Sequence, residues 1–445
     1  MTAITGYMPR VEFTPPPSML RETKPWPAAA RFAFRFFAVY FIWYVFASQM
    51  LGSFVLIPGF RAPNFGEMTP LKQIAMWFGH ALLGVKPTLH PSGSGDTLYD
   101  WTLAFTMVVI SAIIAIVWSL RTTATRHDKF LKWFSLFLRF ALGTTMFTYG
   151  FAKVFPLQMP TVFLSRLLEP YGNFSPMGVI WYSIGASPGY ERFIGSAEVL
   201  GGLLLFLPQT ALLGALVTFA VTTGVWMVNM TYDVPVKLFA FHLVVMSIVL
   251  FAPDIPRLLD MFVFHRPVEA KPAPRYGNTP KAQRAWAIAQ VVFAVWALGL
   301  STYQGNKSWH MFGGAAPKSM FYGIWNVDSM TIDGVLRPPL TTDSARYSHA
   351  TFQTPTGAVF QKMDQTFDRF SVKVDSTTHV LALRNLVDTA MSGALKYQRP
   401  TPDRLVLDGS IGGKRVQLVM TQHDLQKFLL VSRGFNWVQE YPINR

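Results

Sequence analysis

Seven long apolar runs dominate this sequence and restrict what it can fold into. A helix that crosses a bilayer needs about 20 mostly apolar residues. The runs occupy residues 32–57, 103–120, 133–152, 193–207, 210–232, 238–252 and 285–303. A further run at residues 74–85 is too short to cross, and its length predicts an interfacial or re-entrant helix. The sequence therefore predicts a mainly α membrane protein, a bundle of seven transmembrane helices.

The composition agrees with this class and excludes several kinds of chemistry. Only 14% of the 445 residues are charged, compared with about a quarter in soluble domains. The absence of cysteine excludes disulfides, thiolate nucleophiles and iron–sulfur clusters. His242 is the single histidine inside a predicted span, and the histidines further on lack metal-ligand spacing. We therefore expect neither a haem nor a metal site.

The basic residues predict how the chain crosses the membrane. Lys and Arg gather before the first run and at residues 121–132 and 253–284, which share one side if all seven runs cross. The positive-inside rule places that side, and the N-terminus, in the cytoplasm. This assignment accounts for the net charge of +15 without nucleic-acid binding, and it puts the C-terminal part outside.

The chain after residue 303 predicts a separate antiparallel β domain, a small barrel or sandwich. Apolar and polar residues alternate at residues 346–352, 370–374, 379–384, 404–407 and 415–420. Gly412 and Gly413 predict a hairpin turn. The early Trp325, preceded by Gly323, and the late Arg433 resemble the opening and closing residues of lipocalin-like barrels. Residues 437–445 form either a docking peptide for a partner or a last strand or cap of this domain.

Ionisable residues inside the apolar runs usually face a bundle interior or a wet cavity. They recur here with small residues at helical spacing, which gives each of three successive runs one polar face. Estimated depths place Arg139 and Glu198 at similar heights, so we expect an ion pair between them at the floor of a pocket open to the outside. The other predicted pocket residues are Tyr149, Lys153, Glu191, Asn229, Asp233, Lys237 and His242.

Each of these residues has a structural alternative. The predicted Arg139–Glu198 pair either fixes helix packing or serves a bound headgroup or proton transfer. Glu198 and His242 are the candidates for handling protons, although His242 is equally explained as a hydrogen-bonded packing residue. Lys153 and Lys237 either attract an anion or extend to the membrane interface.

The same residues carry a resemblance to a known family. Arg139 with Gly143, Gly150-Phe-Ala-Lys153, Glu198-Val-Leu-Gly-Gly-Leu-Leu-Leu205, and Asn229 with Tyr232-Asp233 resemble the DoxX family of bacterial four-helix membrane proteins. The resemblance covers residues 131–255. It implies a bacterial inner membrane and an association with quinone-linked sulfur oxidation or redox stress complexes. The additional runs and the β domain depart from the simplest members.

The predicted organisation has five segments. They are a cytoplasmic segment (1–31), two additional spans (32–130), a DoxX-like four-helix core (131–255), a linker with the seventh span (256–303) and an extracytoplasmic β domain (304–445). The predicted function is an accessory or quinone-interacting subunit of a membrane redox assembly, in contact with lipid and a periplasmic or membrane redox partner. A non-catalytic scaffold or assembly factor and a small-solute transporter are the alternatives.

Overall fold

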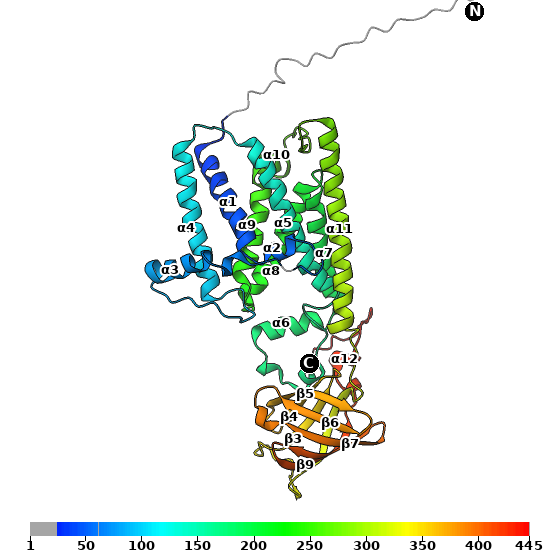
Figure 1. Cartoon of the computed structure of the whole chain (residues 1–445). Helices are drawn as coiled ribbons and strands as arrows, with labels where there is room; N and C mark the ends of the chain where they lie inside the picture. Colours follow the sequence, from blue (N-terminus) through cyan, green and yellow to red (C-terminus); the bar gives the residue numbers. More distant parts are fainter. Residues whose placement is uncertain (1–24, 61, 445) are drawn as a thin grey trace, which may run out of the picture.

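The computed structural model describes residues 25–60 and 62–444, which form a helical part and a β-barrel placed end to end (Figure 1). Helix α1 begins at the end of the helical part away from the barrel, whereas α11 ends near the barrel. Residues 1–24, most of the predicted cytoplasmic segment, lie outside the described residues.

The helical part combines long helices with short connecting ones. Its elements are α1 (Ala28–Ala47), α2 (Met50–Phe54), η2 (Phe65–Glu67), α3 (Leu71–Leu83), α4 (Leu98–Arg121), α5 (Asp128–Val154), η3 (Leu164–Leu168), η4 (Tyr171–Asn173), α6 (Pro176–Gly185), α7 (Pro188–Phe206), α8 (Ala211–Thr231), α9 (Lys237–Phe251), η5 (Ala252–Asp254), α10 (Ile255–Phe262) and α11 (Pro280–Phe312).

Five helices in the described part of the chain are long and apolar enough to cross a membrane. They are α1, α4, α8, the continuous segment Lys237–Phe262, and α11. This indicates a multi-pass membrane protein. The other two predicted spans form α5 and α7, each of which begins five residues before the predicted run. Charged residues lower the mean hydropathy of both helices.

Several predicted boundaries differ from the structure. The first run does not form one helix, because the backbone at Ser48 is extended and the Ser48 hydroxyl accepts a hydrogen bond from the Met50 amide (3.3 Å). A side chain that bonds to nearby backbone in this way competes with helix continuation. Helix α11 continues through residues 304–312, which we had assigned to the β domain.

The short apolar run forms α3, which lies across the direction of the long helices (Figure 1). It ends at Gly84, whose φ of 66° is the left-handed conformation that commonly terminates a helix. Trp77 on α3 is 60% exposed. An exposed tryptophan on a helix in this orientation agrees with an interfacial helix.

The second part is a closed antiparallel barrel of eight strands. These are β1 (Gly323–Ile332), β3 (Tyr347–Phe352), β4 (Gly357–Lys362), β5 (Phe367–Asp375), β6 (Val380–Asn385), β7 (Gly393–Thr401), β8 (Arg404–Ile411) and β9 (Lys414–Gln422). Each pairs with the next, and β9 pairs with β1 to close the barrel; the short β2 (Val335–Leu336) pairs with the end of β1. The five predicted strand segments and the Gly412–Gly413 turn, where both φ angles are positive, are confirmed.

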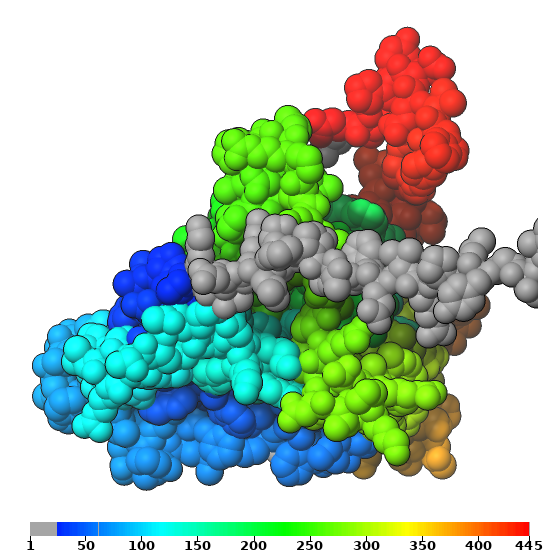
Figure 2. All heavy atoms as spheres, turned by 90° about the horizontal axis from the view of Figure 1, so that it is seen from above, coloured from blue at the N-terminus to red at the C-terminus, as the bar shows by residue number. Residues whose placement is uncertain are grey.

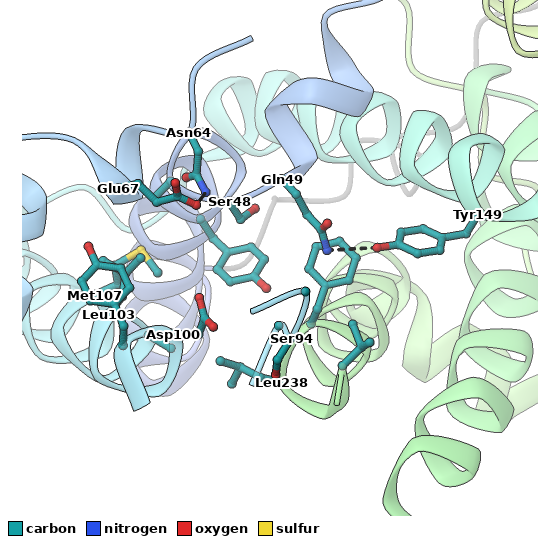
Figure 3. A pocket seen from close by; sticks show the side chains of 18 residues that line it. Ser48, Gln49, Asn64, Glu67, Ser94, Asp100, Leu103, Met107, Tyr149 and Leu238 are labelled. Atoms are coloured by element: carbon teal, nitrogen blue, oxygen red, sulfur yellow. Dashed lines mark hydrogen bonds between the residues drawn. The ribbon is translucent and has the colours of Figure 1, made fainter. Parts of the chain in front are cut away.

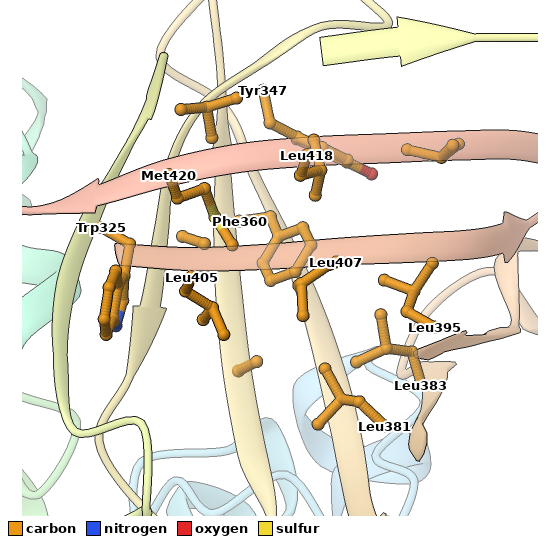
Figure 4. Packing of buried hydrophobic residues seen from close by; sticks show 14 of the residues in the cluster. Trp325, Tyr347, Phe360, Leu381, Leu383, Leu395, Leu405, Leu407, Leu418 and Met420 are labelled. Atoms are coloured by element: carbon orange, nitrogen blue, oxygen red, sulfur yellow. The ribbon is translucent and has the colours of Figure 1, made fainter. Parts of the chain in front are cut away.

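Apolar side chains fill the interior of the barrel (Figure 4). Trp325 is fully buried, and its indole N–H donates to the Phe321 carbonyl (2.8 Å). The cation that covers its ring is Arg399, at 5.7 Å from the ring centroid. Arg433, the closing residue of the lipocalin-like pattern, lies beyond the last strand and donates to the Gln439 side chain (3.2 Å).

The barrel contacts the connection between α5 and α6. The Leu164 amide donates to Oε1 of Gln353 (2.8 Å), and the Gln361 side chain donates to the Leu168 carbonyl (3.4 Å). Beyond β9 the chain forms η7 (Leu425–Lys427) and α12 (Leu429–Ser432) and then runs without regular structure to residue 444. The alternative of a last strand in this region is therefore wrong.

Candidate functional site

Close packing between α5 and α7 sets the geometry of the candidate site. A Cβ added to Gly150 would lie 2.9 Å from the Gly195 carbonyl oxygen, and one added to Gly202 would lie 2.8 Å from the Gly143 carbonyl oxygen. Glycines at these four positions let the two backbones touch. The small residues of the two predicted polar faces therefore do face each other.

A buried ion pair joins the two helices beside this contact. Nζ of Lys153 lies 2.8 Å from both carboxylate oxygens of Glu198. Each side chain is only 3% exposed. Lys153 is therefore buried and does not extend to the membrane interface, and the alternative that it attracts an anion stays a prediction.

Arg139 does not reach Glu198, so the predicted Arg139–Glu198 pair is wrong. Its guanidinium donates to the carbonyls of Leu205 (2.7 Å) and Phe206 (2.9 Å) and to the Tyr276 hydroxyl (3.3 Å). It thus caps the last turn of α7, where a cation is favoured by the helix dipole. The glycine register places Arg139 opposite Phe206, eight residues or about 12 Å along α7 from Glu198.

The Lys153–Glu198 pair lines a pocket of about 250 Å³. Tyr149 of α5 and Asn229 of α8 line the same pocket, so the structure brings together four of the nine predicted site residues. Met177 and Trp181 of α6 complete the lining. Because α6 lies between the long helices and the barrel (Figure 1), it covers this pocket on the barrel side.

Several side chains in this pocket have donor hydrogens that the described hydrogen bonds leave unused. Nε2 of Gln49 donates to the Tyr149 oxygen (3.0 Å), which leaves the phenol proton available. Lys153 directs two of its three N–H groups to Glu198. Asn229 uses one amide hydrogen on the Val236 carbonyl (3.2 Å). The rest of the lining is mainly apolar, so a ligand that enters would find a few polar groups at fixed positions.

Glu191 is fully buried next to this pocket without lining it. Its Oε1 accepts a hydrogen bond from the Met159 amide (2.9 Å). Its Oε2 has no partner among the described residues, and neither does Oε1 of Gln158, which lines the pocket. Two unpaired buried acceptors on this side mark a place where a donor from a ligand or a proton would be stabilised.

His242 lies apart from the Lys153–Glu198 pair and is already hydrogen-bonded. Its Nε2 is 2.6 Å from the Tyr40 hydroxyl, and its Nδ1 is 2.7 Å from the Leu238 carbonyl. Its ring stacks on Tyr44 with the centroids 4.0 Å apart. This arrangement favours the packing alternative that we considered for His242, and its role in proton handling stays a prediction.

Asp233 and Lys237 form an exposed pair (2.9 Å) outside the pocket. Nearby, Asp96 from the connection before α4 accepts hydrogen bonds from the backbone amides of Lys237 (2.7 Å) and Leu238 (2.8 Å). Asp96 therefore caps the start of α9. The predicted residues Asp233 and Lys237 lie at a junction between connections, where they do not touch the Lys153–Glu198 pair.

A second pocket, of about 390 Å³, shares Gly93, Tyr149, Val236 and Phe239 with the first. Figure 3 shows its lining and the Gln49–Tyr149 hydrogen bond that lies on the shared wall. Sequence reasoning missed its polar residues, which come mostly from connections: Ser48, Gln49, Asn64, Glu67, Ser94 and Asp100. One available signal was the Thr97-x-x-Asp100 capping box, which the structure contains.

The described residues include no group of three or more His, Asp or Glu side chains that could hold a metal ion. The polar chemistry of the two pockets therefore rests on hydrogen bonds and on one ion pair.

A related protein exists in Bacillus subtilis (strain 168), where it is described as "Uncharacterized protein YwoB". The two sequences are 32% identical over 129 residues, which make up 29% of this chain and 79% of YwoB. This chain belongs to the family of YwoB. No family model and no solved structure matches the chain. Because YwoB is itself uncharacterised, the relationship places the chain in a family without assigning an activity, and the resemblance to the DoxX family stays a prediction.

Proposed function

We propose that this protein binds the polar headgroup of a small amphipathic molecule, a quinone or a small acid, within a bacterial inner membrane. In this proposal it acts as an accessory component of a DoxX-like redox assembly. The observation that carries the proposal is the buried Lys153–Glu198 pair in the wall of a largely apolar pocket. A charged pair in such a place is costly unless packing or a ligand makes use of it.

The donors around the pocket suit carbonyl or carboxylate oxygens. The Tyr149 hydroxyl and the third N–H of Lys153 come from α5, and the second amide hydrogen of Asn229 comes from α8. A quinone ring presents carbonyl oxygens that accept such bonds, and its apolar edges fit against Phe239 and Leu243, which also line the pocket. The adjoining second pocket offers further room.

The proposal includes seven crossings with the barrel on the outer side. The charged residues of α5 and α7 lower the hydropathy of both helices, and four of these residues are turned inward: Arg139, Lys153, Glu191 and Glu198 are at most 4% exposed. The basic connections before α5 and before α11 lie at the end of the helices away from the barrel (Figure 1). Seven crossings with that end in the cytoplasm agree with both features.

A binding experiment tests the headgroup proposal. The protein would be purified in a mild detergent, its lipid extract examined for quinones, and a short-chain ubiquinone analogue titrated by equilibrium dialysis. Val225→Phe fills part of the pocket without touching a charge, and we expect it to weaken binding at least about tenfold, or 1.4 kcal/mol. Asp233→Asn, on the exposed pair outside the pocket, is the matched control and should bind normally. Equal binding by both variants and the parent would refute the site.

A scaffold function is the second candidate, and Arg139 favours it. Arg139 caps the last turn of α7, and this contact supports a packing role for a buried charge in this chain. Glu198→Gln separates the two functions. Removing one member of a buried pair lowers the melting temperature under either function, so ligand binding decides between them. Ligand binding by the parent that Glu198→Gln weakens and Arg139→Gln does not supports the headgroup site, whereas no ligand binding by the parent or the variants supports the scaffold.

A further inference from the structure

The segment that follows the barrel, residues 425–444, is short of contacts and rich in exposed apolar side chains. Phe435, Trp437, Val438 and Tyr441 are 77%, 91%, 77% and 83% exposed. Leu430 in α12 is 59% exposed. We call this stretch the post-barrel segment. Its exposure contrasts with the barrel interior, where Trp325 and Phe360 are fully buried.

The topology of the barrel fixes where the post-barrel segment begins. An even number of antiparallel strands brings the last strand out at the end where the first strand starts. The His423 amide accordingly donates to the Ile324 carbonyl (2.7 Å), at the start of β1. Only ten residues separate β1 from the end of α11. The post-barrel segment therefore starts where the chain arrives from the membrane helices.

The two views agree on its position. In Figure 1, α12 lies just beyond the barrel-side end of α11, between α11 and the barrel. Figure 2, seen along the helices from the opposite end, shows this red segment projecting sideways beyond the helices. The segment therefore projects over the barrel-side surface of a bilayer that surrounds the helices. The end of α11 is itself apolar there, with Met311 and Phe312 51% and 76% exposed.

We propose that the post-barrel segment lies in the barrel-side interface of the phospholipid bilayer and anchors the barrel to the membrane surface. Tryptophan, tyrosine and phenylalanine partition into this interfacial layer, since their rings are apolar and their polar edges remain hydrated. Lys427 and Arg433 outweigh Glu440 within the same segment, and the remaining positive charge favours anionic headgroups. The apolar surface is thereby covered without a protein partner. This inference is independent of the ligand proposed for the pockets.

The absence of native cysteine allows a direct test on the full chain. Val438→Cys carries an NBD fluorophore, and the protein is reconstituted into vesicles of phosphatidylcholine and phosphatidylglycerol. Val335→Cys is the matched control: it is 64% exposed and pairs with the far end of β1, which at 3.3 Å per residue is about 30 Å from the start of that strand. Nitroxide lipids labelled at the headgroup or near the acyl-chain end report depth.

We expect the emission maximum of NBD at position 438 in vesicles to lie at a shorter wavelength than that of NBD in aqueous buffer. Lipids with a nitroxide at the headgroup should quench more than half of this emission. NBD at position 335 should show neither effect. Replacing Phe435, Trp437 and Tyr441 together by serine should abolish the response at position 438. Equal, unquenched emission at both positions would overturn the proposal. A shortened wavelength at position 438 without nitroxide quenching would overturn it too, because it would show that protein covers the segment.

Discussion

Replacing Lys153 by methionine should destabilise the helical part far more than replacing both members of its ion pair. Glu198 would remain 3% exposed without a cation. Breaking a buried pair by removing one partner costs about 3–5 kcal/mol, whereas replacing both members by apolar residues of similar volume is often neutral. We therefore expect Lys153→Met to lower the melting temperature in detergent by on the order of 5–15 °C, and Lys153→Met with Glu198→Leu to recover most of that loss.

The chain provides a matched control at its surface. Arg266 also pairs with a carboxylate, that of Asp260 (3.7 Å), but the two side chains are 68% and 40% exposed. Exposed pairs contribute only about 0–1 kcal/mol, so Arg266→Met should leave the melting temperature nearly unchanged. The measurement is intrinsic tryptophan fluorescence during heating, in one detergent for all variants. If Lys153→Met and Arg266→Met behaved alike, or if the double variant were as unstable as Lys153→Met, the buried pair would not carry the energy assigned to it.

Three further outcomes can be checked on the same preparation. Gly150→Ala should cost about 1–3 kcal/mol through its clash with the α7 backbone, whereas Gly224→Ala, with open space around it on α8, should be neutral or stabilising by up to about 1 kcal/mol in heat denaturation. Arg139→Gln should cost about 3 kcal/mol by leaving α7 carbonyls without charged donors. Burial, reinforced by a neighbouring histidine, lowers the pKa of His349 in the barrel. As pH falls, the unfolded chain therefore protonates this histidine before the folded barrel does. The contribution of His349 to barrel stability is fully present above about pH 6.5 and decreases below it. The amide-exchange protection factors of β3 should accordingly depend less on pH in His349→Gln than in the parent.

Periodicity predicted the elements of the fold where a segment is long or strictly alternating. The apolar runs became helices, and the alternating segments at residues 404–407 and 415–420 became β8 and β9. The barrel strands β1, β4 and β7 were not predicted. In β7, Gly393 and Pro400 interrupt the alternating pattern, although both lie within the strand. Helix α6 was also missed, although Ser175 followed by Pro176 is a recognisable helix start.

For the candidate site, the sequence predicted which residues share one face of a helix, but not which residues pair between two helices. Spacing correctly placed Gly143 and Gly150 on one side of α5, because helical geometry alone decides which residues share a face. The height of one helix against another cannot be read from the spacing within either helix. Helix α7 begins at Pro188, five residues before the predicted start. The close contacts of Gly150 with Gly195 and of Gly143 with Gly202 fix the height of α7 against α5, and this height brings Glu198 within reach of Lys153 and not of Arg139.

Two buried charged residues, Arg139 on α5 and Glu198 on α7, allow protein stability and ligand binding to be tested separately. Arg139 satisfies carbonyls at the end of α7 and lines neither pocket, whereas Glu198 lines the smaller pocket. Since both residues are almost completely buried on the same two helices, Arg139→Gln controls for any general loosening that Glu198→Gln would cause. If the headgroup proposal is correct, Arg139→Gln should lower the melting temperature and keep ligand affinity near that of the parent, while Glu198→Gln should reduce affinity. Parallel losses of affinity in both variants would mean that the pocket senses only the packing of α5 against α7, and the scaffold function would then be the better account.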